Sequence, residues 1–251
     1  MLLYLKIAPS MRLYQLTRIG ANHVNHCEDY TVTESLRGGR TLCAVMDGCS
    51  MGTDSYLAAT LTGKLFRKIA RERSLYNRSS AIDCHSELKE IMWALITELN
   101  QIKQRLALQD DELLNTVILA VLDFKTDEGC ILTVGDGLIC VNGTLTEYKQ
   151  NNTPDYLGYH LRDDFDTWFT AQQQVLSVSG LGDISLSTDG IYTFEQYTPG
   201  SFPEAPDPID YLLRNPDDLA LPNMLLKKVV TLEQEFGLRP GDDLGIIRVC
   251  R

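Results

Sequence analysis

Acidic residues stand at the ends of several apolar runs in this chain. The runs that finish at Asp47, Asp136 and Asp189 are each followed directly by a glycine. A short apolar run is typical of a buried strand, and the glycine after it lets the chain turn away at once. The sequence therefore predicts carboxylates at the rims of sheets. The same pattern includes the acidic pair that precedes these strands and the pair that opens the last one: Glu28, Asp29, Asp242 and Asp243.

This pattern of carboxylates indicates a binding site for hard metal ions. Acids that are far apart in sequence repel one another strongly if the fold brings them together without cations. Oxygen ligands suit Mg²⁺ or Mn²⁺, whereas zinc or copper would call for Cys or His at ligand spacing. The alternative for each Asp-Gly pair, taken singly, is a simple hairpin turn. Three such pairs together with two acidic pairs favour one shared metal site.

Five segments carry a family resemblance, by their sequence and by their order. They resemble the motifs of the metal-dependent type 2C (PPM) protein phosphatases, in the bacterial-like single-domain form, over nearly the whole chain. The segments are CEDY at 27–30, AVMDGCSMG at 44–52, LTVGDG at 132–137, LSTDGIY at 186–192 and GDDLGIIRV at 241–249. Each motif alone is weak evidence, whereas all five in this order are strong evidence.

The resemblance implies a centre of two metal ions, Mn²⁺ or Mg²⁺, with a third and weaker position. Asp47 would bridge the two ions, and the carbonyl of Gly48 would bind one of them. Asp189 and Asp242 would ligate the other ion. Asp136 would pair with Asp189 at the weaker third position.

The resemblance also implies catalytic roles for the acidic pair of the first segment. Glu28 would act through a metal-bound water, and Asp29 would orient a water beside the metals. Asp243 stands where family members commonly have Asn, so the sequence leaves its role open.

Two departures from the family pattern bear on catalysis. The family usually has an arginine four residues before the glutamate of the first motif, where this chain has Val24. A bidentate guanidinium that would hold the substrate phosphate is therefore missing from that place. Many members have His after the first Asp-Gly pair, as a candidate proton donor, where this chain has Cys49. Candidates for a relocated phosphate-binding group are His26 and Arg18, with His23 and Asn25 beside them.

Composition agrees with one globular domain spanning residues 1–251. A chain of 251 residues with 44% hydrophobic and 23% charged residues can bury a full core. The net charge of −11 argues against binding to nucleic acid or to an anionic membrane. Seven cysteines without a Cys-x-x-Cys pair favour reduced thiols in a cytoplasmic protein. The apolar start, residues 1–9, is too short for a signal peptide or a transmembrane helix and is interpreted as a strand or a disordered start.

Hydrophobic periodicity predicts both strands and long helices. Strands are expected at 11–17, 41–47 and 244–250, and helices at about 53–73, 81–108 and 222–236. The second helix carries an apolar stripe that is interpreted as core packing: Ile91, Leu95, Leu99, Ile102 and Leu106.

The middle of the chain is interpreted as hairpins. The runs at 116–124, 130–137 and 138–148 are expected to form an antiparallel meander with a turn at Asn142-Gly143. The runs at 174–180 and 183–190 are expected to pair with each other. The segment 150–174, with Trp168 and Phe169, is expected to cover the metal face as a flap, and the proline-rich segment 198–208 is expected to be a loop.

These expectations combine into one fold and one function. Strands outnumber helices and hairpins dominate, which favours an α+β fold of packed antiparallel sheets flanked by helices. The resemblance implies a four-layer α-β-β-α sandwich with the metals at one end. It further implies a serine/threonine protein phosphatase that hydrolyses phosphomonoesters through a metal-activated water. The alternative is a pseudophosphatase, a regulatory binding module with the same fold and little turnover. The expected partner is a phosphorylated protein, and neither nucleic acid nor a membrane is expected.

Overall fold

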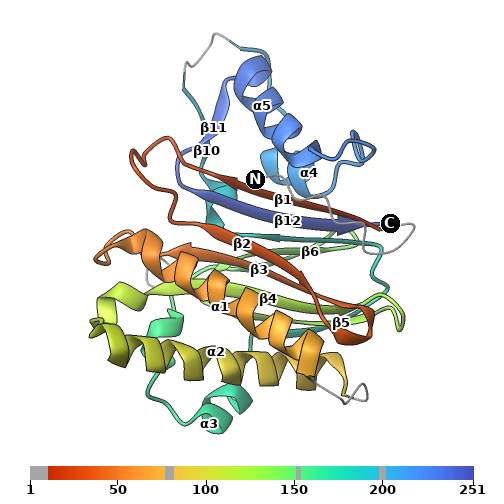
Figure 1. Cartoon of the computed structure of the whole chain (residues 1–251). Helices are drawn as coiled ribbons and strands as arrows, with labels where there is room; N and C mark the ends of the chain where they lie inside the picture. Colours follow the sequence, from red (N-terminus) through yellow and green to blue (C-terminus); the bar gives the residue numbers. More distant parts are fainter. Residues whose placement is uncertain (1–10, 77–81, 151–153, 198–201) are drawn as a thin grey trace.

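Two antiparallel sheets of five strands each lie face to face at the centre of the fold (Figure 1). The computed structural model describes residues 11–76, 82–150, 154–197 and 202–251. The first sheet has the order β1 (Arg12–Arg18), β12 (Leu244–Cys250), β9 (Asp183–Ser187), β6 (Gly137–Val141), β7 (Thr144–Tyr148). The second has the order β2 (Tyr30–Ser35), β3 (Arg40–Gly48), β4 (Asn115–Asp123), β5 (Glu128–Val134), β8 (Val175–Ser179).

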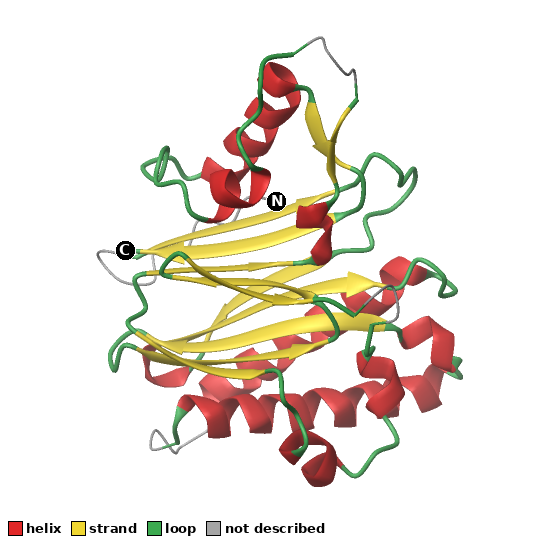
Figure 2. Ribbon diagram, turned by 180° about the vertical axis from the view of Figure 1, so that it is seen from behind, coloured by secondary structure: helices red, strands yellow, loops and turns green. Residues whose placement is uncertain are grey.

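Helices cover the outer face of each sheet (Figure 2). The long helices α1 (Ser55–Tyr76) and α2 (Cys84–Leu106) lie on the second sheet, with the short α3 (Phe165–Thr170) beside α2. On the first sheet lie α4 (Pro208–Leu213) and α5 (Met224–Phe236), next to a small ribbon of β10 (Phe194–Gln196) and β11 (Leu238–Pro240). The predicted α+β class and the four-layer α-β-β-α sandwich are therefore confirmed.

The strand β4 shows why two stacked sheets follow from this sequence. Successive side chains of a strand point to opposite faces of its sheet. In β4, Val117, Leu119 and Val121 pack toward the helices, while Ile118 and Leu122 pack between the two sheets. Both faces of this strand are buried, which explains its unbroken apolar run.

The two long predicted helices and the closing strand are confirmed, with small differences in their bounds. Asp83 caps α2 by accepting a hydrogen bond from the backbone N–H of Ser86 at 2.7 Å. Along the predicted stripe of α2, Ile91, Leu95 and Leu99 are buried. Leu106 is 65% exposed, so the stripe ends before the last turn of the helix.

Two of the predicted strand pairings are wrong. The connection Gly135–Gly137 was expected within a meander, but β5 and β6 belong to different sheets. Gly135 and Gly137 have positive φ values of 94° and 138°, which lead the chain from one sheet to the other. The expected β8–β9 hairpin is also wrong, because β8 pairs with β5 and β9 pairs with β12 and β6. The turn at Asn142-Gly143 is confirmed between β6 and β7.

The predicted flap is only partly correct. Trp168 and Phe169 are buried in the hydrophobic layer between the second sheet and its helices, so they do not cover the carboxylates. The start of the same segment does reach the candidate site, through Tyr156. Residues 151–153 of this segment, residues 198–201 of the predicted proline-rich loop, and the N-terminal residues 1–9 interpreted as a strand or disordered start lie outside the described residues.

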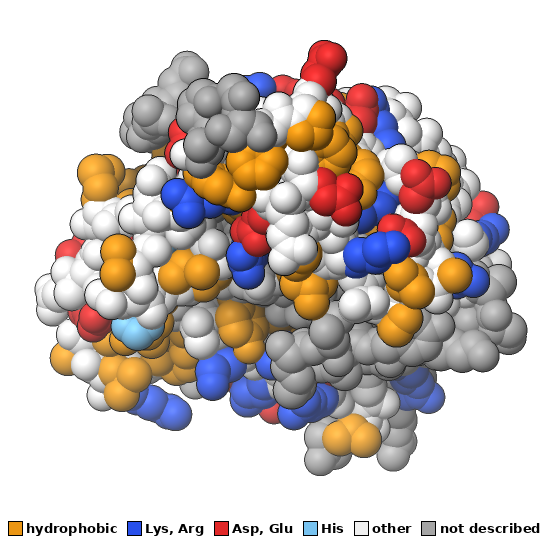
Figure 3. All heavy atoms as spheres, turned by 90° about the horizontal axis from the view of Figure 1, so that it is seen from above, with side chains coloured by type: hydrophobic (Ala, Val, Ile, Leu, Met, Phe, Trp, Pro, Cys, Tyr) orange, Lys and Arg blue, Asp and Glu red, His pale blue; other side chains and the backbone are white. Residues whose placement is uncertain are grey.

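The outer surface carries charges of both signs. On the face that bears α4 and α5, acidic and basic side chains are interspersed with hydrophobic and uncharged ones (Figure 3). None of the described helices combines the length and the apolar composition needed to cross a membrane. All seven cysteines are free thiols.

Candidate functional site

The antiparallel pairing brings the predicted acids to one end of the sandwich. Asp29 directly precedes β2 and Asp47 lies near the end of β3, and Tyr30 pairs with Met46 between them. Asp136 occupies the crossing from β5 to β6, while Asp189 follows β9. Asp242 and Asp243 directly precede β12, beside the end of β9, because Ile246 pairs with Ser187. Five segments that are distant in sequence therefore meet at one rim.

Asp29 and Asp47 are two acids that face each other, and Asp29 is buried. Burial raises the pKa of Asp29 well above its ordinary value, although a hydrogen bond from Thr188 opposes the shift. Burial likewise raises the pKa of Asp47, and the charges of Asp29 and Asp189 raise it further. Oδ1 of Asp29 is buried and has no hydrogen-bond partner among the described residues. Two facing acceptors of this kind require a proton, a water or a cation between them.

Asp189 is the second centre of negative charge. Burial raises its pKa from 3.8 to about 6, and the charges of Asp136 and Asp242 contribute to the rise. Asp136 is itself 9% exposed, and its burial raises its pKa. Asp136 and Asp189 therefore lie close enough to interact, as the sequence predicted for the weaker metal position. Whether they share an ion stays a prediction.

The donor set fits hard divalent cations. The ligand candidates Asp47, Asp136, Asp189 and Asp242 offer only carboxylate oxygens, which is the chemistry of Mg²⁺ and Mn²⁺ sites. As placed in the described residues, no three His, Cys, Asp or Glu side chains converge tightly enough to hold one ion. Mg²⁺ usually keeps several waters rather than an all-protein shell, so such a site does not require three side chains on one ion.

Glu28 turns toward the start of α1. Its carboxylate accepts a hydrogen bond from Ser50 Oγ at 2.7 Å and another from Ser55 Oγ. Asp29 is held by Thr188, whose hydroxyl donates to Asp29 Oδ2 at 2.6 Å and accepts from the backbone N–H of Gly245 at 2.8 Å. Sequence reasoning missed these three hydroxyl groups, since a serine or threonine next to an acidic motif carries no distinctive spacing.

Two glycines of the Asp-Gly pairs are needed for close packing rather than for turning. A Cβ atom on Gly48 would lie 2.2 Å from the carbonyl oxygen of Ser55. A Cβ atom on Gly190 would lie 1.8 Å from the carbonyl oxygen of Asp243. Any side chain at these positions would push apart segments that carry the acids. The predicted contact of the Gly48 carbonyl with a metal stays a prediction.

The position of the missing arginine is open to solvent. Val24 is 88% exposed and lines a cavity of about 290 Å³ together with Asn25, His26 and Glu28. The His26 ring packs on Tyr56, with ring centroids 4.3 Å apart. His26 therefore lies near the acidic pair, and its role in substrate binding stays a prediction.

Arg18 does not join this cavity. Its guanidinium makes two hydrogen bonds to the carboxylate of Glu233 on α5, at 2.5 and 2.7 Å. Both hydrogen bonds come from one nitrogen, Nη2, and they hold the guanidinium against α5. The role of Arg18 in phosphate binding stays a prediction, and the carboxylate of Glu233 from a distant helix competes for its side chain.

Cys49 occupies the place of the expected histidine and is 5% exposed. The hydroxyl of Tyr156 lies beside its thiol, and burial is the main cause that raises the pKa of Tyr156. The charges of Asp47 and Asp136 raise that pKa further. His160 anchors this segment through contacts of 2.7 Å to Asp155 and 2.8 Å to Asp163. Tyr156 thus supplies a polar hydroxyl at the site that the sequence analysis did not identify.

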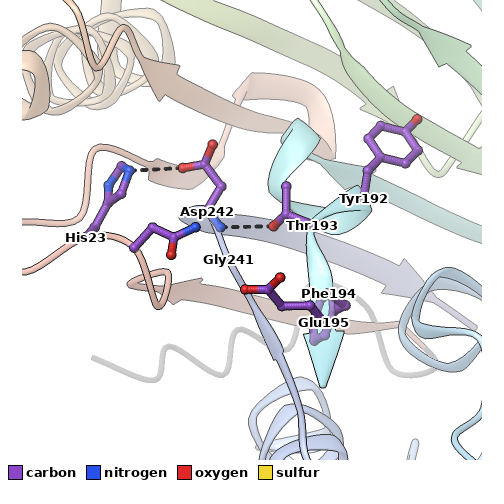
Figure 4. A pocket seen from close by; sticks show the side chains of 8 residues that line it. His23, Tyr192, Thr193, Phe194, Glu195, Gly241 and Asp242 are labelled. Atoms are coloured by element: carbon purple, nitrogen blue, oxygen red, sulfur yellow. Dashed lines mark hydrogen bonds and ion pairs between the residues drawn. The ribbon is translucent and has the colours of Figure 1, made fainter. Parts of the chain in front are cut away.

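A second cavity, of about 450 Å³, opens next to Asp242 (Figure 4). It is lined by Asn22 and His23 from the loop before β2, by Gly241 and Asp242, and by the segment after Asp189: Tyr192, Thr193, Phe194 and Glu195. The two cavities share Asn22 and His23, so this loop separates them.

Comparison with known proteins identifies the family. The family model described as Protein phosphatase 2C matches residues 19–220. The chain therefore belongs to the protein phosphatase 2C family. A comparison with curated proteins found no match.

Solved structures show the same fold at low sequence identity. A bacterial serine phosphatase bearing an arginine-to-alanine mutation gives a TM-score of 0.62 at 12% identity, covering 95% of this chain and 97% of that one. The S. agalactiae serine/threonine phosphatase gives 0.59 at 15% identity, covering 96% and 99%. The catalytic domain of the phosphatase PstP, in complex with two manganese ions, gives 0.58 at 14% identity, covering 96% and 98%.

Proposed function

We propose that this protein is a Mg²⁺- or Mn²⁺-dependent serine/threonine protein phosphatase that hydrolyses phosphomonoesters. The observation that carries the proposal is the pair Asp29 and Asp47, which face each other, with an acceptor oxygen of the buried Asp29 unpartnered among the described residues. A fold would gain nothing from bringing two repelling acids together at one rim unless a cation normally offsets their charge. Family membership and the manganese found with the similar phosphatase PstP support the same assignment.

The acids divide into metal-holding and water-orienting groups. Asp47, Asp189 and Asp242 would hold two cations, with the Gly48 carbonyl as an added ligand, and Asp136 would serve a weaker third position. When bound, such ions supply positive charge for the phosphoryl oxygens and lower the pKa of water. Asp29 stays outside this ligand set.

The chain's own groups would position the attacking water. The Thr188 hydroxyl fixes Asp29 Oδ2, while Oδ1 has no donor as a partner in the described part of the chain and would accept a hydrogen bond from a water. Such a bond fixes the direction of attack on phosphorus. Glu28, held by Ser50 and Ser55, would act on water around the metals from the side of α1.

The proposed substrate is a phosphorylated protein of the cytoplasm. The cavities beside Asp242 and Glu28 are open to solvent on the rim of the fold, so a phosphorylated side chain on a peptide could enter them. Without an arginine at position 24, His26 is the nearest candidate for a donor to the phosphate.

The direct test is hydrolysis by the purified protein. A phosphoserine peptide and an aryl phosphate are supplied with Mn²⁺, and then with excess chelator. We expect turnover with Mn²⁺ that chelator abolishes and added Mn²⁺ restores. Turnover that survives complete removal of metal would refute the proposed mechanism.

A second candidate function is a regulatory binding module with weak or no turnover. It is favoured by Val24 and Cys49, which replace the phosphate-holding arginine and the expected histidine. One similar solved structure, with a TM-score of 0.54 at 17% identity, is described in connection with the bacterial stressosome, a modular system that controls secondary messenger signalling. Binding of the phosphopeptide in the presence of Mn²⁺, without any release of phosphate, would favour this candidate over the enzyme.

A further inference from the structure

Asp243 ties the first and last motifs together. It is 2% exposed, and its Oδ1 accepts a hydrogen bond from the backbone N–H of Gly20 at 2.6 Å. Its Oδ2 accepts from the backbone N–H of Glu28 and lies 2.9 Å from Nδ1 of His23. One buried carboxylate therefore fixes both ends of the loop that leads into the acidic pair.

These contacts explain why aspartate rather than asparagine occupies this position. Both backbone groups donate, and a carboxylate accepts at both of its oxygens. An asparagine would place an NH₂ group against at least one of these N–H donors. Its single carbonyl oxygen could not serve Gly20 and Glu28 together, since they approach different oxygens. The carboxylate of Asp243, where the family commonly has Asn, thus suits the hydrogen-bond donors that surround it in this chain.

His23 connects Asp243 to Asp242. While Nδ1 faces Asp243, Nε2 lies 3.2 Å from Oδ1 of Asp242 (Figure 4). The same oxygen accepts a hydrogen bond from the backbone N–H of Asp243 at 2.8 Å. Two contacts therefore hold Oδ1 of Asp242 in place.

We propose that His23, held by Asp243, is a positioning residue that orients Asp242 for metal binding. The inference rests on the proposed function, in which Asp242 is a metal ligand. Groups that hydrogen-bond to a metal-binding carboxylate restrict its rotation, and their loss commonly weakens metal binding by about 10- to 100-fold. The Asp242 side chain is 43% exposed, so without His23 it would be free to turn into solvent.

The test measures Mn²⁺ affinity by calorimetry on metal-free protein, with His23→Gln as the variant. We expect the dissociation constant to rise by about 10- to 100-fold. The melting temperature in chelator should fall only modestly, because the amide of a glutamine can still donate a hydrogen bond to Asp243. His85→Gln is the matched control, since His85 lies on α2 with its ring 5.6 Å from Phe169, and it should bind Mn²⁺ as the wild type does. Unchanged affinity in His23→Gln would overturn the inference.

A double substitution separates positioning from other roles. If His23 acts only through the Asp243–Asp242 chain, then Asp243→Asn and His23→Gln combined should weaken Mn²⁺ binding little more than the stronger single variant. Additive losses would contradict that coupling. A raised KM for the phosphopeptide with unchanged Mn²⁺ affinity would also contradict it, and would place His23 on the phosphate instead.

The binding readout keeps this inference separate from the proposed function. A wild-type protein that binds Mn²⁺ but hydrolyses neither substrate would refute the enzyme, while a weaker affinity of His23→Gln would still support the positioning role. A wild-type protein that turns over normally, with His23→Gln equal to it in Mn²⁺ affinity, would refute the positioning role alone.

Discussion

Replacing Asp189 by Asn should stabilise the metal-free protein and weaken its response to metal. The folded protein binds a proton at Asp189 up to about pH 6, whereas the unfolded chain releases it near 3.8. The free energy of unfolding therefore falls as pH rises from about 4 to 6, and the full penalty is present above pH 6. The difference between the two pKa values corresponds to about 3 kcal/mol.

The free energy of unfolding that Asp189→Asn gains should be somewhat smaller than this figure. Asp136 and Asp242 contribute to the repulsion and respond when the charge at 189 is removed. We therefore expect Asp189→Asn to gain about 1 to 3 kcal/mol at pH 7.5 in chelator, or roughly 2 to 10 °C in melting temperature for a chain of this size. At pH 4 the gain should nearly vanish, because the wild-type acid is then largely protonated.

The assay is thermal unfolding in chelator and in saturating Mn²⁺, at pH values from 4 to 8. Mn²⁺ should raise the melting temperature of the wild type far more than that of Asp189→Asn, since ligand binding stabilises only the form that holds it. Asp166→Asn is the matched control, because Asp166 forms an exposed ion pair with Lys89 away from the acids. A lower melting temperature of Asp189→Asn in chelator at pH 7.5 would refute the repulsion on which this reasoning rests.

Four further substitutions test the site. Asp47→Asn should reduce kcat by orders of magnitude, since a neutral amide cannot replace the anion that would hold the metal ions. Near wild-type turnover would show that Asp47 is not a metal ligand. Asp136→Asn should mainly raise the Mn²⁺ concentration needed for half-maximal activity, and complete loss of metal binding in calorimetry would contradict its weaker position. Val24→Arg should lower KM for the phosphopeptide, because a guanidinium at this exposed position can reach the cavity beside Glu28. An unchanged KM would mean that the substrate phosphate binds outside this cavity. The wild type should cleave aryl phosphates faster than phosphoserine peptides, because an alkoxide leaves poorly without a proton donor. Cys49→His should reduce this difference in rate by raising kcat for the peptide. Equal wild-type rates, with chemistry rate-limiting, would show that another group donates the proton.

The sequence by itself determined the main helices and strands, and it showed which acids lie at strand ends. Alternation, apolar runs and helix caps are local signals, so α1, α2 and β12 were predicted close to their observed bounds. The acids at positions 47 and 189 come at the ends of apolar runs, which are typical of buried strands. Their convergence was predicted by the order of the five motifs, through the family resemblance, and the strand registers agree with it.

Only the tertiary structure decided which strands pair and which polar groups meet. A Gly-Asp-Gly connection is locally as suitable for a hairpin as for a crossing between sheets, and the crossing is selected because both β5 and β6 bury a face in the layer between the sheets. Arg18 likewise forms an ion pair with Glu233, 215 residues away in sequence, and Asp243 contacts His23, 220 residues away. Such contacts depend on the packing of distant segments, which leaves no periodic trace in the sequence.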